Sequence, residues 1–323
     1  MENMKIVVLD SCAVTPGDLD WSGLSGLGAE VVTYPHTTDE QAAARIGDAE
    51  FAILNKVFIG DEVLRACPNL RWVGVTATGI DSLDVEACRR AGVAVANVPS
   101  YSTESVAQMT WALALELCQC PGRHDAAVRD GRWKAGPAGP YGILPAAELA
   151  GKTLGVLGFG EIGRRVSAIG QAFGMRVISH TRTVRKEYEG LGVEFVGLDA
   201  LFARADVLSL HCPATPATKG IVNARTLALM RPGARIVNTA RGALVDEEAV
   251  CGALCSGRLA GYAADVMAAE PIRADSPLLA APNTILTPHI AWTTPEALAR
   301  LSHEVCENLR AFLQGEMRNI VNL

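Results

Sequence analysis

Thr153-Leu-Gly-Val-Leu-Gly-Phe-Gly-Glu-Ile-Gly163 joins an apolar run to a glycine-rich turn, and a helical pattern follows it. The glycines Gly158, Gly160 and Gly163 have the spacing G-x-G-x-x-G. Gly158 permits a tight turn, Gly160 lets the backbone approach a pyrophosphate, and Gly163 lets the helix pack closely on the strand. Because an apolar strand precedes the glycines and a helix follows, the stretch predicts a dinucleotide-binding turn.

Short apolar runs continue beyond this turn and alternate with helical patterns. We expect strands at residues 154–157, 176–179, 207–210, 235–238, 261–264 and 284–286. Helices are expected at residues 161–173 and 247–255, with a terminal helix at 295–313. Strands that alternate with helices indicate a parallel sheet covered on both faces.

The first hundred residues repeat the same alternation. The expected strands are residues 5–9, 30–33, 51–54, 72–75 and 94–97, with helices such as 61–66 and 84–91 between them. A longer helix is expected at 102–118, a surface loop at 136–140, and a turn at the glycine-rich residues 23–28. The fold class is therefore α/β, with two Rossmann-like, doubly wound parallel-sheet domains.

The composition is that of an ordinary globular protein, with 49% hydrophobic and 20% charged residues. A length of 323 residues exceeds what one core usually holds, which favours two domains. The net charge, 29 − 35 = −6, argues against nucleic acid or an anionic membrane as a partner.

Targeting and metal-binding signals are missing from the sequence. No apolar run approaches the roughly 18 residues of a membrane span, and residues 6–9 are too short for a signal-peptide core. The nine cysteines have no regular spacing, and Cys118 with Cys120 matches no common zinc pattern. We therefore expect a cytoplasmic protein with reduced thiols and no metal site.

The strand expected at 176–179 leads into Thr181 and Arg182 without an acidic residue. An acid about 20 residues after the glycines binds the ribose 2′-hydroxyl of NAD, whereas an arginine accommodates the 2′-phosphate of NADP. The sequence therefore favours NADP(H) over NAD(H). The alternative is that Arg182, Arg185 and Lys186 are solvated charges at the start of a loop.

Three later motifs each follow a predicted strand. They are Asn238-Thr-Ala-Arg241-Gly, Ala269-Glu270-Pro271 and Thr287-Pro-His289-Ile-Ala-Trp292. Ligands of open α/β sheets bind beyond the carboxyl ends of the strands, so Arg241, Glu270 and His289 are candidates for one site. The other histidines are expected to be structural: His36, His124, His180, His211 and His303.

With these motifs in this order, the whole chain resembles the D-isomer-specific 2-hydroxyacid dehydrogenases, and most of all the glycerate dehydrogenase (hydroxypyruvate reductase) members. Ala77-Thr78-Gly79, Asn97-Val-Pro99 and Ser105-Val-Ala107 also fit that family's pattern. The resemblance implies a nicotinamide-dependent enzyme that reduces a small 2-keto acid, or runs the reverse reaction.

The resemblance assigns a catalytic role to each of three residues. Arg241 binds the substrate carboxylate and polarises its carbonyl, as suits a planar and permanently charged guanidinium. His289 donates the proton, since its unperturbed pKa of about 6.5 lies in the useful range. Glu270 orients His289.

Further binding residues follow from the same resemblance. The substrate-binding set adds Ala77, Thr78, Gly79 and Trp292 to Arg241 and His289. The cofactor-binding set comprises the three glycines, Arg241 and His289 together with Val106, Phe159, Glu161, Ile162, Thr181, Arg182, Cys212, Pro213, Thr218, Thr239, Ala240 and Asp265. We expect Asp265 to contact the nicotinamide end or the His289–Glu270 pair.

The resemblance also implies a discontinuous first domain. Residues 1–100 and 292–323 form the substrate domain, and residues 101–291 form the NAD(P)-binding domain inserted into it. The hinge lies near residues 99–101 and 291–293, and the helix from Ser102 supports a homodimer. Residues 136–144 carry fewer aromatic side chains than expected of this family, which leaves the substrate open.

Four functions remain open from the sequence. Hydroxypyruvate or glyoxylate is the favoured substrate, giving D-glycerate or glycolate. A larger 2-keto acid is the alternative within the class. Oxidation of formate or phosphite is a further possibility, although formate oxidation usually has Gln where this chain has Glu270. A cofactor-sensing corepressor on the same fold is the non-enzymatic alternative.

Overall fold

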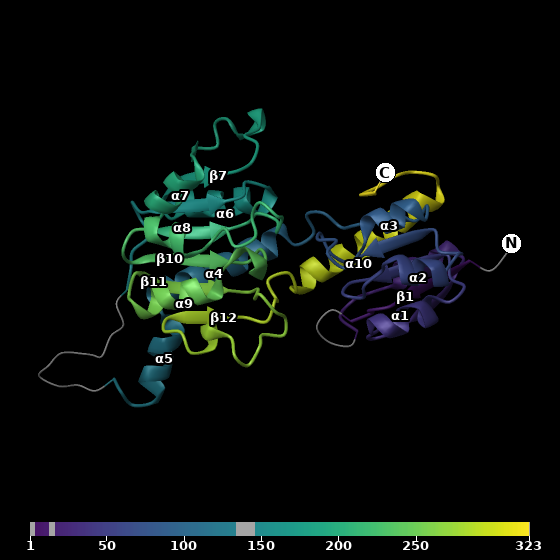
Figure 1. Ribbon diagram of the computed structural model, residues 1–323, viewed down its shortest axis with the longest axis horizontal. Helices are drawn as coiled ribbons and strands as arrows, with labels where there is room; N and C mark the ends of the chain where they lie inside the picture. Colours follow the sequence, from purple (N-terminus) through teal and green to yellow (C-terminus); the bar gives the residue numbers. More distant parts are fainter. Residues whose placement is uncertain (1–3, 13–16, 134–145, 323) are drawn as a thin grey trace, which may run out of the picture. The chain divides into compact units, whose positions relative to one another are not determined.

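The computed structural model describes residues 4–12, 17–133 and 146–322. The chain forms two compact units, one comprising Met1–Ser102 with Trp292–Leu323 and the other Thr103–Ala291. Each unit is built on its own parallel sheet (Figure 1). The sequence expectations at residues 136–144 lie outside the described residues.

The first unit has a five-stranded sheet in the order β2-β1-β3-β4-β5, and all of its pairings are parallel. The strand order reverses beside β1, which is the flavodoxin-like version of a doubly wound sheet. The strands are β1 (Lys5–Val8), β2 (Glu30–Thr33), β3 (Phe51–Leu54), β4 (Trp72–Val75) and β5 (Ala94–Ala96).

Helices cover both faces of this first sheet. One face packs against α1 (Asp39–Ile46), α2 (Asp61–Ala66) and α3 (Val85–Arg90). The other packs against the 3-10 helix η1 (Ser22–Leu27) and the terminal helix α10 (Pro295–Leu313). Because both faces are buried, β3 and β4 are apolar throughout rather than alternating.

The second unit has a seven-stranded parallel sheet in the order β12-β11-β10-β9-β6-β7-β8. Its strands are β6 (Thr153–Leu157), β7 (Arg176–His180), β8 (Val193–Phe195), β9 (Val207–Leu210), β10 (Ala234–Asn238), β11 (Leu259–Ala264) and β12 (Thr284–Leu286). The chain runs outward from β6 in one direction, then returns to β9 and runs outward in the other. This is the Rossmann order extended by one strand.

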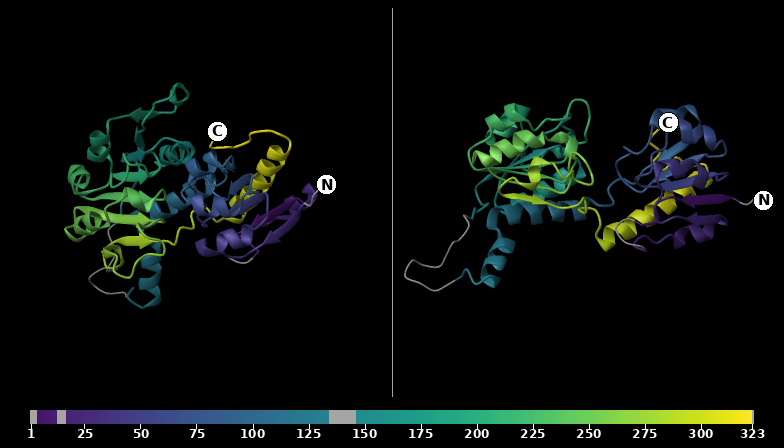
Figure 2. Two further views of the ribbon diagram at one scale, coloured as in Figure 1. Left: turned by 45° about the vertical axis from the view of Figure 1, so that its right-hand side comes forward. Right: turned by 60° about the horizontal axis from the view of Figure 1, so that its bottom comes forward.

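Helices lie on both sides of the second sheet, as the two views of Figure 2 show. One face packs against α4 (Thr103–Gln119) and α6 (Glu161–Ala172), and the other against α7 (Leu198–Arg204), α8 (Ala224–Leu229) and α9 (Glu247–Cys255). Neighbouring residues of one strand serve opposite faces, with Ile236 in one core and Val237 in the other. The short helix α5 (Pro121–Arg129) has no buried residue.

The predicted fold class is confirmed. Every predicted strand is present, with bounds within two residues of those expected. Periodicity missed α1, α5, α7, α8 and β8, which have between three and nine residues each. The glycine-rich residues 22–27 form η1, and Gly28 ends it in the left-handed conformation.

Candidate active site

The glycine turn lies where the order of the second sheet reverses, between β6 and its neighbour β9. Gly158 has a φ of +95°, and a Cβ there would stand 2.7 Å from the backbone of both His211 and Cys212. A Cβ on Gly163 would stand 2.2 Å from the carbonyl oxygen of Gly158. Both positions therefore require glycine on steric grounds, and the crevice of a doubly wound sheet opens at this reversal.

The start of α6 fits an anionic ligand. Gly160 is the N-cap of this 12-residue helix, and no side chain caps it. Nothing lies within 4 Å of the position that a Cβ on Gly160 would take. The first backbone N–H groups of a helix lack partners within it, so this end offers donors and open space to a pyrophosphate. Phe159 anchors the turn edge-on against Tyr188 and Phe195.

Thr181 and Arg182 follow β7, one strand further along the same edge. Arg182 is exposed, and no carboxylate of the described chain lies within ion-pairing distance of it. Arg185 instead faces Glu187 at 3.5 Å. His180 is held by a 3.0 Å hydrogen bond between its Nδ1 and the carbonyl of Val196, in keeping with the structural role predicted for it.

The segment after β9 forms the other wall of the reversal. Desolvation lowers the pKa of His211 to about 3, and its Nε2 lies 2.7 Å from the Ser209 hydroxyl, so the ring stays neutral. Burial raises the pKa of the Cys212 thiol to about 11, which keeps it protonated. The Thr218 hydroxyl donates to the carbonyl of Pro213 at 2.7 Å and thereby closes the turn.

Arg241 lies in the turn after β10. The Asn238 side chain donates to the carbonyl of Arg241 at 2.9 Å and accepts from the N–H of Ala240 at 3.1 Å. The hydroxyls of Thr239 and Thr110 are 2.8 Å apart, which ties this turn to α4. Val106, also on α4, is buried, and Thr110 donates to its carbonyl.

His289 and Glu270 form a close pair. Nδ1 of His289 lies 2.6 Å from Oε2 of Glu270, and the two side chains are 31% and 28% exposed. His289 has a φ of +55°, in the left-handed region that few residues other than glycine adopt. A carboxylate that accepts from Nδ1 fixes the orientation of the ring and leaves Nε2 for exchange of a proton with another group.

Asp265 holds the segment that carries His289. It is fully buried directly after β11, and its carboxylate accepts hydrogen bonds from the Thr287 hydroxyl at 2.6 Å and from the N–H groups of Ile290 and Ala291 at 3.0 and 2.8 Å. The N–H of His289 donates to the carbonyl of Asp265 at 2.7 Å. These bonds stabilise the unusual backbone at His289. The sequence indicated Asp265 as a site residue but not this set of contacts.

The remaining substrate-binding candidates belong to the first unit. Ala77, Thr78 and Gly79 follow β4, and this loop is held by the Thr78 hydroxyl, which donates to Val98, and by Asn97, which donates to the carbonyl of Thr78. Trp292 packs edge-on against Tyr101, with ring centroids 6.4 Å apart.

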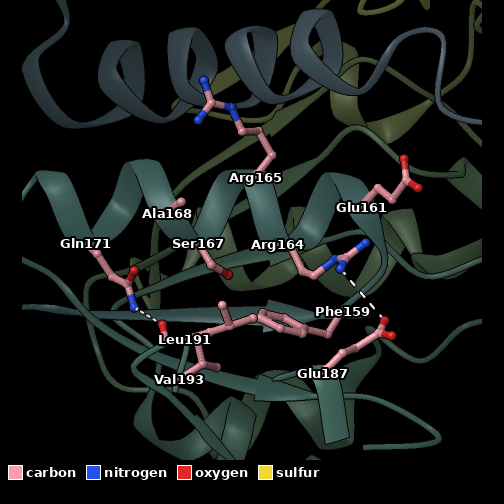
Figure 3. A pocket seen from close by; sticks show the side chains of 10 residues that line it. All are labelled: Phe159, Glu161, Arg164, Arg165, Ser167, Ala168, Gln171, Glu187, Leu191 and Val193. Atoms are coloured by element: carbon pink, nitrogen blue, oxygen red, sulfur yellow. Dashed lines mark hydrogen bonds and ion pairs between the residues drawn. The ribbon is translucent and has the colours of Figure 1, made fainter. Parts of the chain in front are cut away.

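A hollow of about 360 Å³ lies along the exposed side of α6. Figure 3 shows Arg164 of α6 paired with Glu187 across it, and Gln171 donating to the carbonyl of Leu191. None of the three predicted catalytic residues lines this hollow, and of the predicted cofactor-binding residues only Phe159 and Glu161 do. It therefore adjoins the glycine turn but does not include the candidate catalytic residues.

Metal-ligand clusters and membrane-spanning helices are both absent from residues 4–12, 17–133 and 146–322. Across these ranges, no three side chains of the His, Cys, Asp and Glu types gather as metal ligands would. Nor does any described helix combine the length and the apolar character needed to cross a bilayer.

Comparison with known proteins identifies the family. Residues 111–291 match the model of the D-isomer specific 2-hydroxyacid dehydrogenase, NAD binding domain. The chain is 44% identical over 322 residues to a hydroxypyruvate reductase of Blautia hydrogenotrophica, covering 99% of this chain and 100% of that protein. It is 42% identical over 282 residues to a glyoxylate reductase of Aeropyrum pernix, covering 86% of this chain and 84% of that protein.

A solved structure agrees in fold along almost the full length. The crystal structure of the TT0316 protein from Thermus thermophilus superposes with a TM-score of 0.88 at 36% identity, covering 98% of this chain and 100% of that one. Family model, relatives and solved structure point to the same conclusion: the chain belongs to the D-isomer specific 2-hydroxyacid dehydrogenase family.

Proposed function

We propose that this dehydrogenase reduces hydroxypyruvate or glyoxylate to the corresponding 2-hydroxy acid, with His289 as the proton donor. The observation that carries the proposal is the 2.6 Å contact between His289 Nδ1 and Glu270 Oε2 at the carboxyl edge of the second sheet. The Blautia hydroxypyruvate reductase and the Aeropyrum glyoxylate reductase support the choice of substrate.

The order of the candidate residues along that edge supports one extended site. From β12 to β7 the strand ends carry His289, then Asp265 and Glu270, then Arg241, then Cys212, then the glycine turn, then Arg182. Neighbouring strands are about 4.8 Å apart, so the row is a continuous edge that would accommodate an extended dinucleotide. The nicotinamide end would lie toward Arg241 and Asp265, and the adenosine end toward Thr181 and Arg182.

Each residue of the row has a distinct task in the reduction. The reduced nicotinamide, when bound, supplies the hydride that reaches C2 of the keto acid. Arg241 binds the carboxylate and draws electron density toward the carbonyl oxygen. His289 delivers a proton from Nε2 to that oxygen, because its Nδ1 is engaged with Glu270. Glu270 stabilises the charged imidazolium that precedes the transfer.

We further propose that NADP(H) is preferred to NAD(H). The support is the exposed guanidinium of Arg182 just beyond β7, in a turn that has no acidic residue to accept from a ribose 2′-hydroxyl. A guanidinium with no ion-pair partner in the described chain is available for a 2′-phosphate.

A homodimer is the assembly we propose. Three features of the second unit support it. Figure 1 shows α5 standing away from the layers of its own unit, and this helix buries none of its residues. Trp133 beyond it is 67% exposed, and Phe173, whose ring centroid lies 4.9 Å from that of Trp111, is 39% exposed. A second copy would cover these apolar side chains, and light scattering of the purified protein measures the mass directly.

The activity is tested by following the absorbance of NADPH, and separately of NADH, with purified protein and either hydroxypyruvate or glyoxylate. We expect rapid oxidation, faster with NADPH. A panel of longer 2-keto acids is run in parallel as the comparison. Slow turnover of both small acids beside rapid turnover of a longer one would contradict the proposed substrate and leave the reaction class unchanged.

A further inference from the structure

The loop that carries Glu270 has no regular structure of its own. No helix or strand occurs between Asp265, which follows β11, and Ser276, which precedes the 3-10 helix η4 (Pro277–Leu279). A carboxylate on such a loop holds a histidine at 2.6 Å only if the loop backbone is fixed from outside. The contacts that fix it are concentrated at the peptide between Met267 and Ala268.

One side of this peptide rests on the turn of Arg241. A Cβ on Gly242 would stand 1.9 Å from the carbonyl oxygen of Met267 and 2.5 Å from the nitrogen of Ala268. The absence of a side chain at Gly242 therefore lets the turn after β10 and the loop after β11 pack backbone against backbone. Inside the loop, the N–H of Met267 donates to Oε1 of Glu270 at 3.3 Å.

The other side of the peptide is held by Glu247, the first residue of α9. One carboxylate oxygen accepts from the N–H of Ala268 at 2.8 Å, and the other accepts from the Ser276 hydroxyl at 2.8 Å. Asp246 caps the helix by accepting from the N–H of Ala249, so the Glu247 carboxylate is not needed as a cap. Glu247 thus forms hydrogen bonds with the Glu270 loop near both of its ends.

We infer that Glu247 is a positioning residue for the reaction, acting through the loop to keep Glu270 against His289. The inference rests on the proposed roles of Glu270 and His289. The connection runs from Glu247 to Ala268, through the neighbouring Met267 to Glu270 Oε1, and from Glu270 Oε2 to His289. Every link is a contact of 3.3 Å or less or a single peptide bond.

The test compares three variants of the full chain. Glu247→Ala removes both acceptors, Glu247→Gln keeps the shape, and Glu248→Ala removes the exposed neighbouring carboxylate as a matched control. We measure kcat and KM with hydroxypyruvate, the Kd of NADPH and NADH, and the hydrogen exchange of peptides that cover residues 266–276.

For Glu247→Ala we expect kcat to fall at least about tenfold, since misplacing a reacting group by roughly 1 Å can lower a rate about 100-fold. The Kd of the cofactor should stay within about twofold, and exchange in residues 266–276 should accelerate. Glu247→Gln should restore most of kcat, because its carbonyl accepts from Ala268 and its amide donates to the Ser276 hydroxyl. Glu248→Ala should behave as the unaltered protein.

Three results would overturn the inference: a kcat of Glu247→Ala within about twofold of the unaltered protein, an equal loss in Glu247→Gln, or a parallel loss of cofactor binding. If Glu247→Ala does not fold, Ser276→Ala removes only the second contact and must still accelerate exchange in the loop. Should the unaltered protein turn over no 2-keto acid, the proposed function fails, whereas unchanged exchange in Glu247→Ala refutes the positioning contact by itself.

Discussion

The two parallel sheets share one plan and differ in what their carboxyl edges carry. Each reverses its strand order once, between β1 and β3 in the first unit and between β6 and β9 in the second. A doubly wound sheet has its binding crevice at such a reversal. The crevice beside β6 is lined by the glycine turn and the start of α6. The corresponding position beside β1 is occupied by Asp10.

At the point where the strand order of the first sheet reverses, the side-chain carboxylate of Asp10 occupies the position that an anionic ligand would take. It is 8% exposed, and one of its oxygens accepts from the N–H groups of Asn55 and Lys56 at 2.9 and 3.0 Å. Those two N–H groups, at the end of β3, would otherwise be free for an anion. In the second unit, Gly160 presents open space where the first unit has a carboxylate. Topology therefore fixes where a crevice forms, and the turn residues decide whether an anionic ligand can enter.

The largest effect on catalysis should come from the residues at the His289 end of the carboxyl edge of the second sheet. We expect His289→Ala to lower kcat roughly 100- to 10,000-fold, the range that general acid catalysis contributes. The Kd of the cofactor should change little, because the glycine turn is intact. Steady-state rates and a fluorescence titration of NADPH measure both quantities. Turnover near that of the unaltered protein would exclude His289 as the proton donor.

Arg241→Lys should come next. A lysine keeps the charge but cannot bind a carboxylate with two parallel N–H groups, so we expect kcat/KM for the keto acid to fall about 10- to 100-fold. Arg225→Lys is the control, since Arg225 pairs with Asp199 on the surface. Equal values of kcat/KM for Arg241→Lys and the control would contradict the bidentate role.

Substitutions at two glycines of the turn should have different effects, one on the stability of the fold and the other on cofactor binding. Gly158→Ala should destabilise the fold by about 1–3 kcal/mol, because φ is +95° and backbone atoms lie 2.7 Å from the added Cβ. Gly160→Val should leave thermal stability almost unchanged and raise the Kd of the cofactor roughly tenfold, the value of one charged hydrogen bond. Thermal melts with cofactor titrations test the pair, and unaltered affinity in Gly160→Val would contradict the assignment of the turn.

Arg182→Ala should have a smaller and more selective effect. We expect the Kd of NADPH to rise about five- to tenfold while that of NADH stays nearly constant, because an exposed charged pair is screened by solvent. Titrations at low and high salt measure this directly. Equal changes for the two cofactors would show that Arg182 does not contact a 2′-phosphate.

The smallest effect on function should come from a substitution at the carboxyl edge of the first sheet. Asp10→Ala removes the acceptor of two backbone N–H groups and should destabilise the protein by about 1–3 kcal/mol. Cofactor affinity should not change. Denaturant unfolding and a cofactor titration check both statements, and a new anion affinity at this edge would show that Asp10 alone keeps it closed.

The sequence was sufficient for the features that depend on local pattern. The glycine turn, the six strands around it and the three motifs that carry Arg241, Glu270 and His289 follow from spacing and from buried apolar runs. The shortest helices gave an uneven result: α2, with six residues, was expected, whereas α7 and α8 were not, because six or seven residues give about two turns or fewer of a 3.6-residue period.

Contacts between segments remote in sequence could not be predicted in the same way. The hydrogen bonds between Asp265 and residues 287–291 depend on β11 and β12 being neighbours in the sheet. The hydrogen bond from Ala268 to Glu247 depends on where α9 begins. Asp265 was noticeable because it follows a buried strand, whereas Glu247 had no signal beyond a position at the start of a helix. The bonds of Asp10 likewise require the pairing of β1 with β3.

The contrast between the two edges is tested most directly by hydrogen exchange with and without saturating NADPH, followed by mass spectrometry. We expect slower exchange in the peptides that cover residues 158–163 and 181–182 when the cofactor is present. Unchanged exchange at residues 158–163, with slowing instead at Asp10 and at residues 55–56, would show that the cofactor binds the first edge and would contradict the site described for the second.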